Sequence, residues 1–98
     1  MAIHVIIKRK VKQGRQAKEL VPLILQMRVC AMYQPGYISG ETLCDIENPE
    51  DCIVISRWET VGDWENWARS PERADIDQKI EILTEEKSEY QIYSPMVP

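Results

Sequence analysis

Apolar and polar residues alternate at the start of the chain, which is the pattern of a strand with one buried face. One side of residues 3–11 carries Ile3, Val5, Ile7, Arg9 and Val11, and the other carries His4, Ile6, Lys8 and Lys10. A turn at Gln13 and Gly14 should follow. The spacing then changes to three and four residues, which predicts a helix from about Arg15 to Met32. Its apolar face is made of Leu20, Val21, Ile24, Leu25, Met27, Ala31 and Met32.

Pro22 lies inside this helical pattern and has no backbone N–H to donate. We expect a kink or a frayed first turn before it. Beyond a break at residues 34–36, residues 37–45 and 52–58 are predicted to be strands joined by a hairpin loop at 46–51. The third strand is apolar on both faces at Ile53, Val54 and Ile55, and we assign Val54, with Ile6 of the first strand, to the face away from the helices.

All three tryptophans lie between residues 58 and 67, where the strand pattern turns directly into a helical one. Thr60 is placed as an N-cap, and Asp63 is placed to return a bond to its backbone N–H. The helix should bury one face, made of Val61, Trp64, Trp67 and Ala68.

Ser70 and Pro71 predict the start of another helix, with Ser70 as N-cap and Pro71 at its first position. Ile76, Ile80 and Leu83 share a face of that helix. Residues 84–87 are read as a connection, 89–93 as a fourth strand, and 94–98 as a short C-terminal tail.

The predicted order β-α-β-β-α-α-β is that of an α+β, ferredoxin-like split β-α-β fold with a four-stranded antiparallel sheet and one added helix. Residues 1–98 form a single domain. Helices cover only one face of such a sheet, and the other face is also apolar here. The simplest cover is a second copy of the chain, so we expect a homodimer.

Composition narrows the class of protein. A net charge of −4 gives no basic footprint for nucleic acid, and no apolar run is long enough to span a membrane. The positive charges at residues 8–10 follow the first apolar run instead of preceding it, which is not the order of a signal peptide. Cys30, Cys44 and Cys52 lack zinc-ligand spacing, and we expect three reduced thiols in a cytoplasmic protein.

Three stretches are similar to the antibiotic-biosynthesis monooxygenase (ABM) domain family. They are MYQPGYISGETL at 32–43, VISRW at 54–58 and WENWARSP at 64–71. The resemblance covers nearly the whole chain and implies a dimeric α+β barrel. Members of that family include cofactor-free oxygenases of aromatic polyketides, quinol oxygenases, haem-degrading enzymes and proteins of no assigned activity.

The haem-degrading branch of the family is disfavoured by two positions. Its pattern has an Asn on the first strand, a Trp on the helix after the third strand, and a His ligand ten residues beyond that Trp. Trp67 matches the Trp, but Ile7 stands at the Asn position and Asp77 at the His position. The single histidine, His4, lies on the opposite face of the strand from Ile7, so haem iron would lack its protein ligand.

The resemblance implies a pocket in which Ile7 approaches Trp67, and the candidate substrate-binding residues are Trp67, Ile7, Trp64, Arg9 and Tyr37. Each has a structural alternative. The indoles can be core anchors, Arg9 can be solvated at the strand end, and Tyr37 can pack in the turn.

Three further side chains, Trp58, Asp77 and His4, have mainly structural interpretations. Trp58 is read as structural. Asp77 is either a pocket carboxylate or an exposed partner of Arg73 four residues away, and we favour the second. His4 is either a base or an inert, hydrogen-bonded side chain in the dimer interior or at its rim, and we favour the second. No catalytic residue, metal site or cofactor is predicted.

The leading function is a cofactor-independent monooxygenase of a quinol-like or polyphenolic compound, with a small aromatic ligand as substrate. The alternative is a non-catalytic ligand-binding or interaction dimer module of the same fold.

Overall fold

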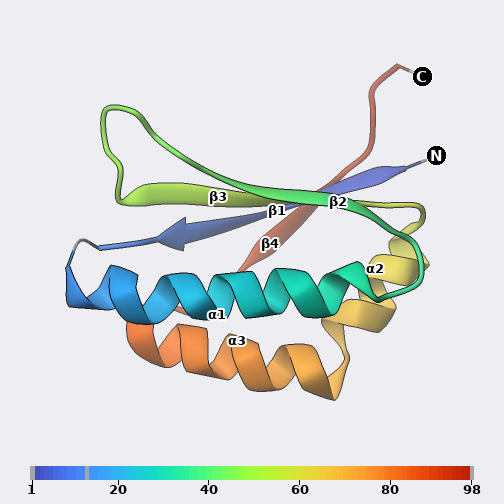
Figure 1. Cartoon of the computed structure of the whole chain (residues 1–98). Helices are drawn as coiled ribbons and strands as arrows, with labels where there is room; N and C mark the ends of the chain where they lie inside the picture. The colour runs from blue at the N-terminus through green and yellow to red at the C-terminus, as the bar shows by residue number, and fades with distance from the viewer. Residues whose placement is uncertain (1, 13, 98) are drawn as a thin grey trace.

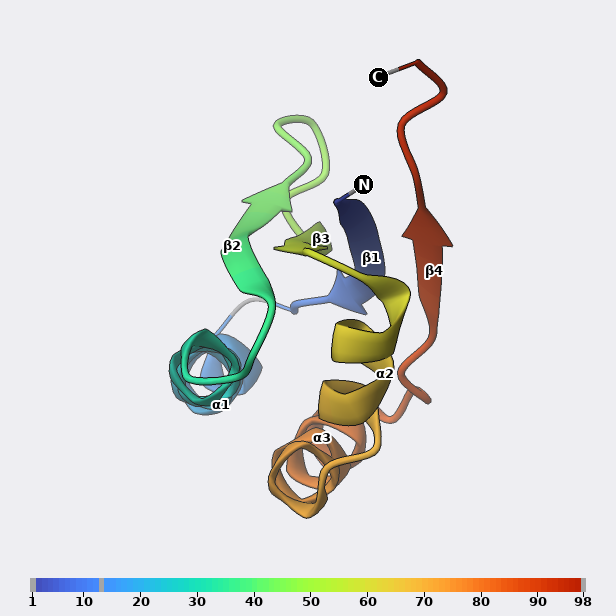
Figure 2. The ribbon, with the colours of Figure 1, turned by 90° about the vertical axis from the view of Figure 1, so that its right-hand side faces the viewer.

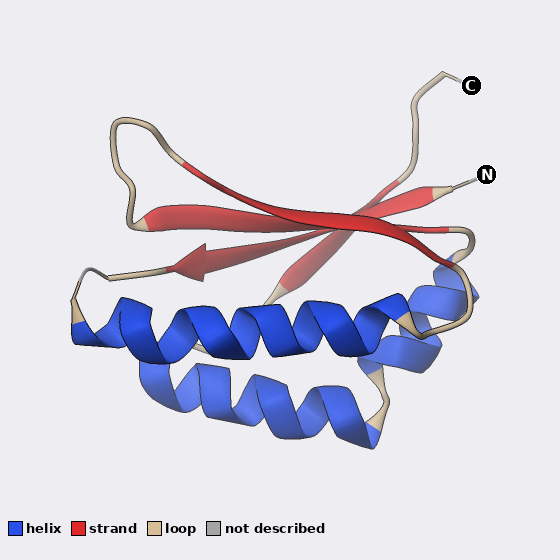
Figure 3. Cartoon of the chain, in the orientation of Figure 1, coloured by secondary structure: helices blue, strands red, loops and turns tan. Residues whose placement is uncertain are grey.

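The computed structural model describes residues 2–12 and 14–97 and contains the predicted order of elements. Gln13, half of the predicted turn, and Pro98, the end of the predicted tail, lie outside the described residues. The elements are β1 (Ile3–Lys10), α1 (Arg15–Met32), β2 (Tyr37–Cys44), β3 (Asp51–Trp58), α2 (Val61–Ala68), α3 (Pro71–Thr84) and β4 (Tyr90–Tyr93). Each lies within a few residues of its predicted bounds, and Figure 3 shows the helices, strands and loops in separate colours.

The four strands form one antiparallel sheet in the order β2-β3-β1-β4, which confirms the ferredoxin-like α+β fold. The helices all pack on one face of this sheet, with α1 and α3 side by side (Figures 1 and 2). Helix α2 follows β3 directly and lies near one end of the helical layer (Figure 1).

Local capping explains where α2 and α3 begin. Thr60 Oγ1 accepts the Asp63 N–H at 3.1 Å, and Ser70 Oγ accepts the Arg73 N–H at 3.2 Å, so both predicted N-caps are confirmed. The Asp63 carboxylate accepts the Thr60 hydroxyl at 2.9 Å, where a bond to the backbone N–H was predicted. It also packs against Gly36, at φ 83°, where a Cβ would overlap the Asp63 side chain.

Helix α1 runs without interruption through Pro22. Its first turn is closed by the Lys18 N–H, which donates to Gly14 O at 3.2 Å, so the fraying offered as one alternative does not occur. The predicted apolar face is divided. Leu20 and Ala31 are buried, whereas Val21, Leu25 and Met32 are each about half exposed or more.

The core is built on the odd-numbered row of β1, which packs against the helices. Ile3, Val5 and Ile7 are buried together with Trp58, Trp64 and Trp67. A second buried cluster, made of Leu20, Ile76 and Ile80, joins α1 to α3. The three buried indoles, which come from the end of β3 and from α2, each contribute a large apolar surface to this core.

The register of the sheet corrects one assignment. Val54 pairs with Ile7 and packs against the buried core, so it faces the helices and not the far face. Side chains alternate along a strand, so Ile53 and Ile55 point away, and Ile55 pairs with Ile6. In a run of three β-branched residues, hydrophobicity alone does not say which one faces inward.

The cysteine prediction was wrong for two of the three residues. Cys44 and Cys52 are directly opposite each other in the β2–β3 hairpin and form a disulfide. Only Cys30 is a free thiol. These two cysteines are eight residues apart in sequence, and they meet because the register of the hairpin pairs their positions. The argument for a cytoplasmic location from reduced thiols therefore no longer holds.

Candidate functional site

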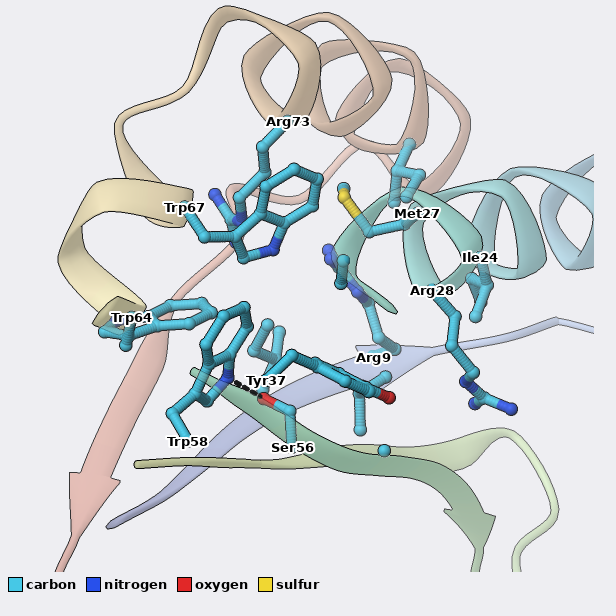
Figure 4. Close-up of a pocket in the computed structure, with 15 residues that line it drawn as sticks. Arg9, Ile24, Met27, Arg28, Tyr37, Ser56, Trp58, Trp64, Trp67 and Arg73 are labelled. Carbon is cyan, nitrogen blue, oxygen red and sulfur yellow. Dashed lines mark hydrogen bonds between the residues drawn. The ribbon is translucent and has the colours of Figure 1, made fainter. Parts of the chain in front are cut away.

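A cavity lies between the helix-covered face of the sheet and the helices (Figure 4). Its volume is about 50 Å³. Its wall is mainly apolar and includes residues from every helix and from β1, β2 and β3. An apolar hollow with a few convergent polar groups is the usual form of a small-molecule site.

All five predicted substrate-binding residues line this cavity. Ile7 and Arg9 come from β1, Tyr37 from β2, and Trp64 and Trp67 from α2. Ile7 and Trp67 belong to the same buried cluster, as the expected approach of β1 to α2 requires. Whether these residues bind a ligand stays a prediction.

Aromatic rings form a continuous edge-to-face series beside the cavity. Ring centroids are 5.3 Å apart between Tyr37 and Trp58, 5.8 Å between Trp58 and Trp64, and 5.0 Å between Trp64 and Tyr90. The Trp58 Nε1–H donates to Ser56 Oγ at 3.0 Å, as Figure 4 shows. The buried Trp64 Nε1 has no hydrogen-bond partner among the described residues.

Arg9 is buried, with 7% of its surface exposed, so the solvated alternative was wrong. Its Nη2 lies 3.3 Å from Asp77 Oδ1, and its Nη1 donates to Ser88 Oγ. The Ser88 hydroxyl in turn donates to Asp77 Oδ1 at 2.8 Å. The buried Arg9 Nε has no partner in the described part of the chain.

Asp77 is the carboxylate that joins two buried guanidinium groups. Its Oδ2 lies 3.9 Å from Arg73 Nη1, which agrees with the predicted i,i+4 pair. Its side chain is only 15% exposed, however, so the expectation of an exposed residue was wrong. Arg9 of β1 reaches the same carboxylate from the sheet, a contact between distant segments that no local pattern indicates.

Positive charge exceeds negative charge around this cavity. Arg73 is 7% exposed, and its guanidinium carbon lies 5.2 Å from the centroid of the Trp64 ring. Burial lowers the pKa of Arg73, Asp77 raises it, and the nearby charge of Arg9 lowers it. Two buried cations that share one carboxylate leave positive charge uncompensated in apolar surroundings.

A third arginine, Arg28 of α1, lies near Tyr37 on the wall of the cavity (Figure 4). Its Nη2 donates to Thr42 Oγ1 at 2.6 Å. Burial raises the pKa of the Tyr37 phenol, and the charge of Arg28 partly opposes this rise. Tyr37 is therefore neutral, and a potential hydrogen-bond donor, at neutral pH.

Several residues of the cavity wall were missed by the sequence reading. Trp58 was read as purely structural and Arg73 only as a partner of Asp77, yet both line the cavity, as do Met27, Arg28 and Ser56. Met27 was assigned to the buried face of α1, and a pattern of burial does not separate a core residue from a cavity wall. The charge of Arg28, next to Met27 in the sequence, was the one feature of α1 that could have indicated a cavity wall.

His4 lies on the face of β1 opposite to Ile7, as predicted, and does not line the cavity. Within residues 2–12 and 14–97, no group of three or more His, Cys, Asp or Glu side chains is placed to hold a metal ion. None of the described helices has the length and apolar character needed to cross a bilayer.

The chain is thus an α+β, ferredoxin-like domain with a tryptophan-lined cavity between its sheet and its helices. The family model of the antibiotic biosynthesis monooxygenase (ABM) domain matches residues 2–79, and the chain belongs to this family.

Among curated proteins, protein SchA of Streptomyces halstedii is 30% identical over 81 residues. This stretch is 81% of the present chain but 20% of SchA, so the chain spans about a fifth of that relative.

Two solved structures show how well the fold is shared. A conserved protein from Methanosarcina mazei Go1 has a TM-score of 0.83 at 24% identity, covering 94% of this chain and 90% of that one. SnoaB, described as a cofactor-independent oxygenase from Streptomyces nogalater, has a TM-score of 0.84 at 14% identity, covering 99% and 95%. At these identities the likeness is one of fold.

Proposed function

We propose that the protein is a cofactor-independent monooxygenase that binds a quinol-like or polyphenolic compound in the cavity. The overall reaction that we propose is the conversion of a hydroquinone and O₂ to a hydroxyquinone and water. One oxygen atom replaces a ring hydrogen, the other leaves as water, and the ring supplies the four electrons. Family membership supports an oxygenase, and the choice of substrate is our proposal.

The observation that carries the proposal is a buried, incompletely satisfied guanidinium in an apolar cavity walled by indoles. Trp67, Trp64 and Ile7 supply flat apolar surfaces for an aromatic ring. Arg9 supplies positive charge at a site where only 7% of the residue is exposed. A charge acts more strongly there than in water because the surroundings are less polarisable.

This arrangement suits chemistry in which an electron-rich substrate reacts with O₂ itself. An ionised ring oxygen pushes electron density into the ring, and a fixed cation beside that oxygen stabilises the anion. Exclusion of water by Trp67 and Met27 keeps the interaction strong. In this proposal Tyr37 donates a hydrogen bond to a second oxygen of the substrate.

The cavity must widen to admit a bicyclic ring, because about 50 Å³ suits only a few water molecules. The side chains best able to move are Met27 and Arg28, which are long, unbranched and only partly buried. Both belong to α1, which forms one wall of the cavity. We propose that ligand entry displaces these two side chains while the indoles stay in place.

The test is oxygen uptake with a panel of hydroquinones, measured with the wild type and with a Trp67→Phe variant. We expect uptake that needs the folded protein and that falls by at least tenfold in the variant, since ring stacking positions the substrate, an effect on the order of 1–3 kcal/mol. Urea unfolding must show that both proteins are folded under the assay conditions. Tyr33→Phe, which changes an aromatic side chain that is 84% exposed, is the control and should leave uptake unchanged.

The alternative is a non-catalytic binding module of the same fold. One observation favours it: no group on the described wall of the cavity is an evident proton acceptor, since the titratable residues there are three arginines and Tyr37. Saturable quenching of tryptophan fluorescence by hydroquinones without oxygen uptake would support the module and refute the oxygenase.

We also propose that two copies pair through the sheet face that the helices leave uncovered. Ile6, Ile53 and Ile55 lie there, each only partly buried in the single chain. A face of this kind gains stability by burial against another apolar surface.

A further inference from the structure

We infer that the ligand enters this cavity already ionised at neutral pH, and that Arg9 binds its anionic oxygen. The inference rests on the proposed function for the location of the ligand, and it adds the chemical class. The ligand is an aromatic compound, such as a substituted hydroquinone, that also carries a carboxylate or a strongly acidic phenol, and it is preferred over a hydroquinone without such a group.

The first step of the argument is the state of Arg9. Nη1 is engaged by Ser88 and Nη2 by Asp77, which together orient the guanidinium plane. Nε remains without a partner although its accessible surface is under 1 Å². A buried N–H donor without an acceptor is costly, and an anionic oxygen is the group that best satisfies it.

The second step is the charge balance. Arg9 and Arg73 are both 93% buried, and both depend on the single carboxylate of Asp77, at 3.3 Å and 3.9 Å. Glu81 lies close by, but its carboxylate accepts the Ser88 N–H and does not line the cavity. Arg28 adds another positive charge to the wall. An anionic ligand therefore neutralises charge that the described residues leave unpaired.

The third step is the proton inventory of the cavity wall. Its titratable groups in the described chain are Arg9, Arg28, Arg73 and Tyr37. Arginine does not release its proton in this pH range, and burial raises the pKa of Tyr37, so that Tyr37 stays protonated. Asp77 is held by two guanidiniums and the Ser88 hydroxyl.

A ligand that had to lose a proton inside the cavity would find no free acceptor on this wall. A ligand that is ionised beforehand needs none. Arg9 then acts as the binding residue, while Asp77 and Ser88 are positioning residues that hold two of its nitrogens and leave the third for the ligand.

Isothermal titration calorimetry at neutral pH with matched neutral and charged probes tests the inference. The probes are 2-naphthoate against 2-naphthamide, and 2,4-dinitro-1-naphthol against 1-naphthol. The anionic member of a pair should bind at least about tenfold more tightly, which is the scale of one hydrogen bond to a charged group. Preference in the first pair identifies a carboxylate, and preference confined to the second identifies an acidic phenol.

Three variants separate a binding role from a structural one. Arg9→Gln should abolish the preference for the anion. Asp77→Asn should strengthen it several-fold, because the internal carboxylate no longer competes for the guanidiniums. Arg69→Gln, at the exposed C-cap of α2 and away from the cavity, is the control and should change nothing.

Equal binding of both members in both pairs, or absence of binding by every probe, overturns the inference. So does an anion preference that persists in Arg9→Gln. If Arg9→Gln does not fold, Asp77→Asn still tests the inference. A stronger preference for the anion in that variant supports the proposal, and weaker anion binding contradicts it.

Failure of the proposed function has a different signature. Anion-selective binding without oxygen uptake from any hydroquinone leaves the inference standing and refutes the oxygenase. Uptake from neutral hydroquinones at least as fast as from carboxylated ones leaves the oxygenase standing and refutes the inference.

Discussion

Tyr37 shows how one side chain is tuned by its neighbours on several elements. Its ring meets the edge of Trp58, and its hydroxyl lies over Gly40, where a Cβ would be only 2.6 Å from the oxygen. Burial raises the pKa of its phenol, and the guanidinium of Arg28 partly lowers it. The same residue lines the cavity, so its ionisation reports on the site.

We predict that Tyr37 titrates at higher pH than an ordinary tyrosine, because burial raises its pKa. The unfolded chain loses this proton first, at a pKa of about 10, so the free energy of unfolding should fall as the pH rises above that value. Tyrosinate absorbance, followed in the wild type and in Tyr37→Phe, isolates the residue. The midpoint of the difference curve should lie at a higher pH than the ordinary pKa of tyrosine.

Arg28→Met provides the control for this titration. Loss of the positive charge should move the Tyr37 pKa still higher, since a cation favours the phenolate. A difference curve at the ordinary pKa, or a downward movement in Arg28→Met, would contradict this view of the cavity wall.

At the level of elements, the hairpin of β2 and β3 is closed by a covalent link. Cys52 is buried, and Arg9 is its partner on the neighbouring strand β1. The disulfide to Cys44 thus links the edge strand β2 to the central strand β3, next to Arg9. A short closed loop restricts the unfolded chain more than it restricts the native hairpin.

We predict that reduction of this disulfide lowers the free energy of unfolding by roughly 2–3 kcal/mol, the scale for a loop of this length. Urea unfolding of a Cys30→Ala variant, with and without reductant, measures the effect without interference from the free thiol. Alkylation of the air-oxidised wild type should modify one thiol after unfolding. Modification of three, or a midpoint unaffected by reductant, would show that the link does not form.

For the whole molecule, the decisive feature is a sheet covered by helices on one face only (Figure 2). Ile6, Ile53, Ile55 and the 46% exposed Leu43 share the other face by the register of the strands. A homodimer that packs sheet against sheet would bury them. Both cavities would remain on the helical sides, so each copy would keep its own site.

We predict that the wild type sediments at about twice the chain mass of 11.4 kDa at micromolar concentration. Ile55→Asp should give monomers or unfold the protein, because a buried, unpaired charge is costly. Ile82→Asp, at a position of α3 that is 69% exposed, is the matched control and should remain dimeric. A monomeric wild type would refute the pairing.

The sequence by itself determined the elements and their order, because these depend on local interactions. Period-two alternation predicted β1, and Thr60 and Ser70 predicted the starts of α2 and α3. The structure confirms the buried face of β1 and both N-caps. Together with the family resemblance, these local patterns were sufficient to predict five residues that line one cavity, namely Ile7, Arg9, Tyr37, Trp64 and Trp67.

Only the tertiary structure decided the features that depend on register and on contacts between distant segments. Val54 faces the helices because it pairs with Ile7, and Cys44 meets Cys52 because the hairpin places them opposite each other. Arg9 and Asp77 are 68 residues apart in sequence, and each reads locally as a solvated charge. They form a buried pair because the fold places α3 on the side of the sheet toward which Arg9 points, and this arrangement follows from burial of the whole core and not from any local pattern.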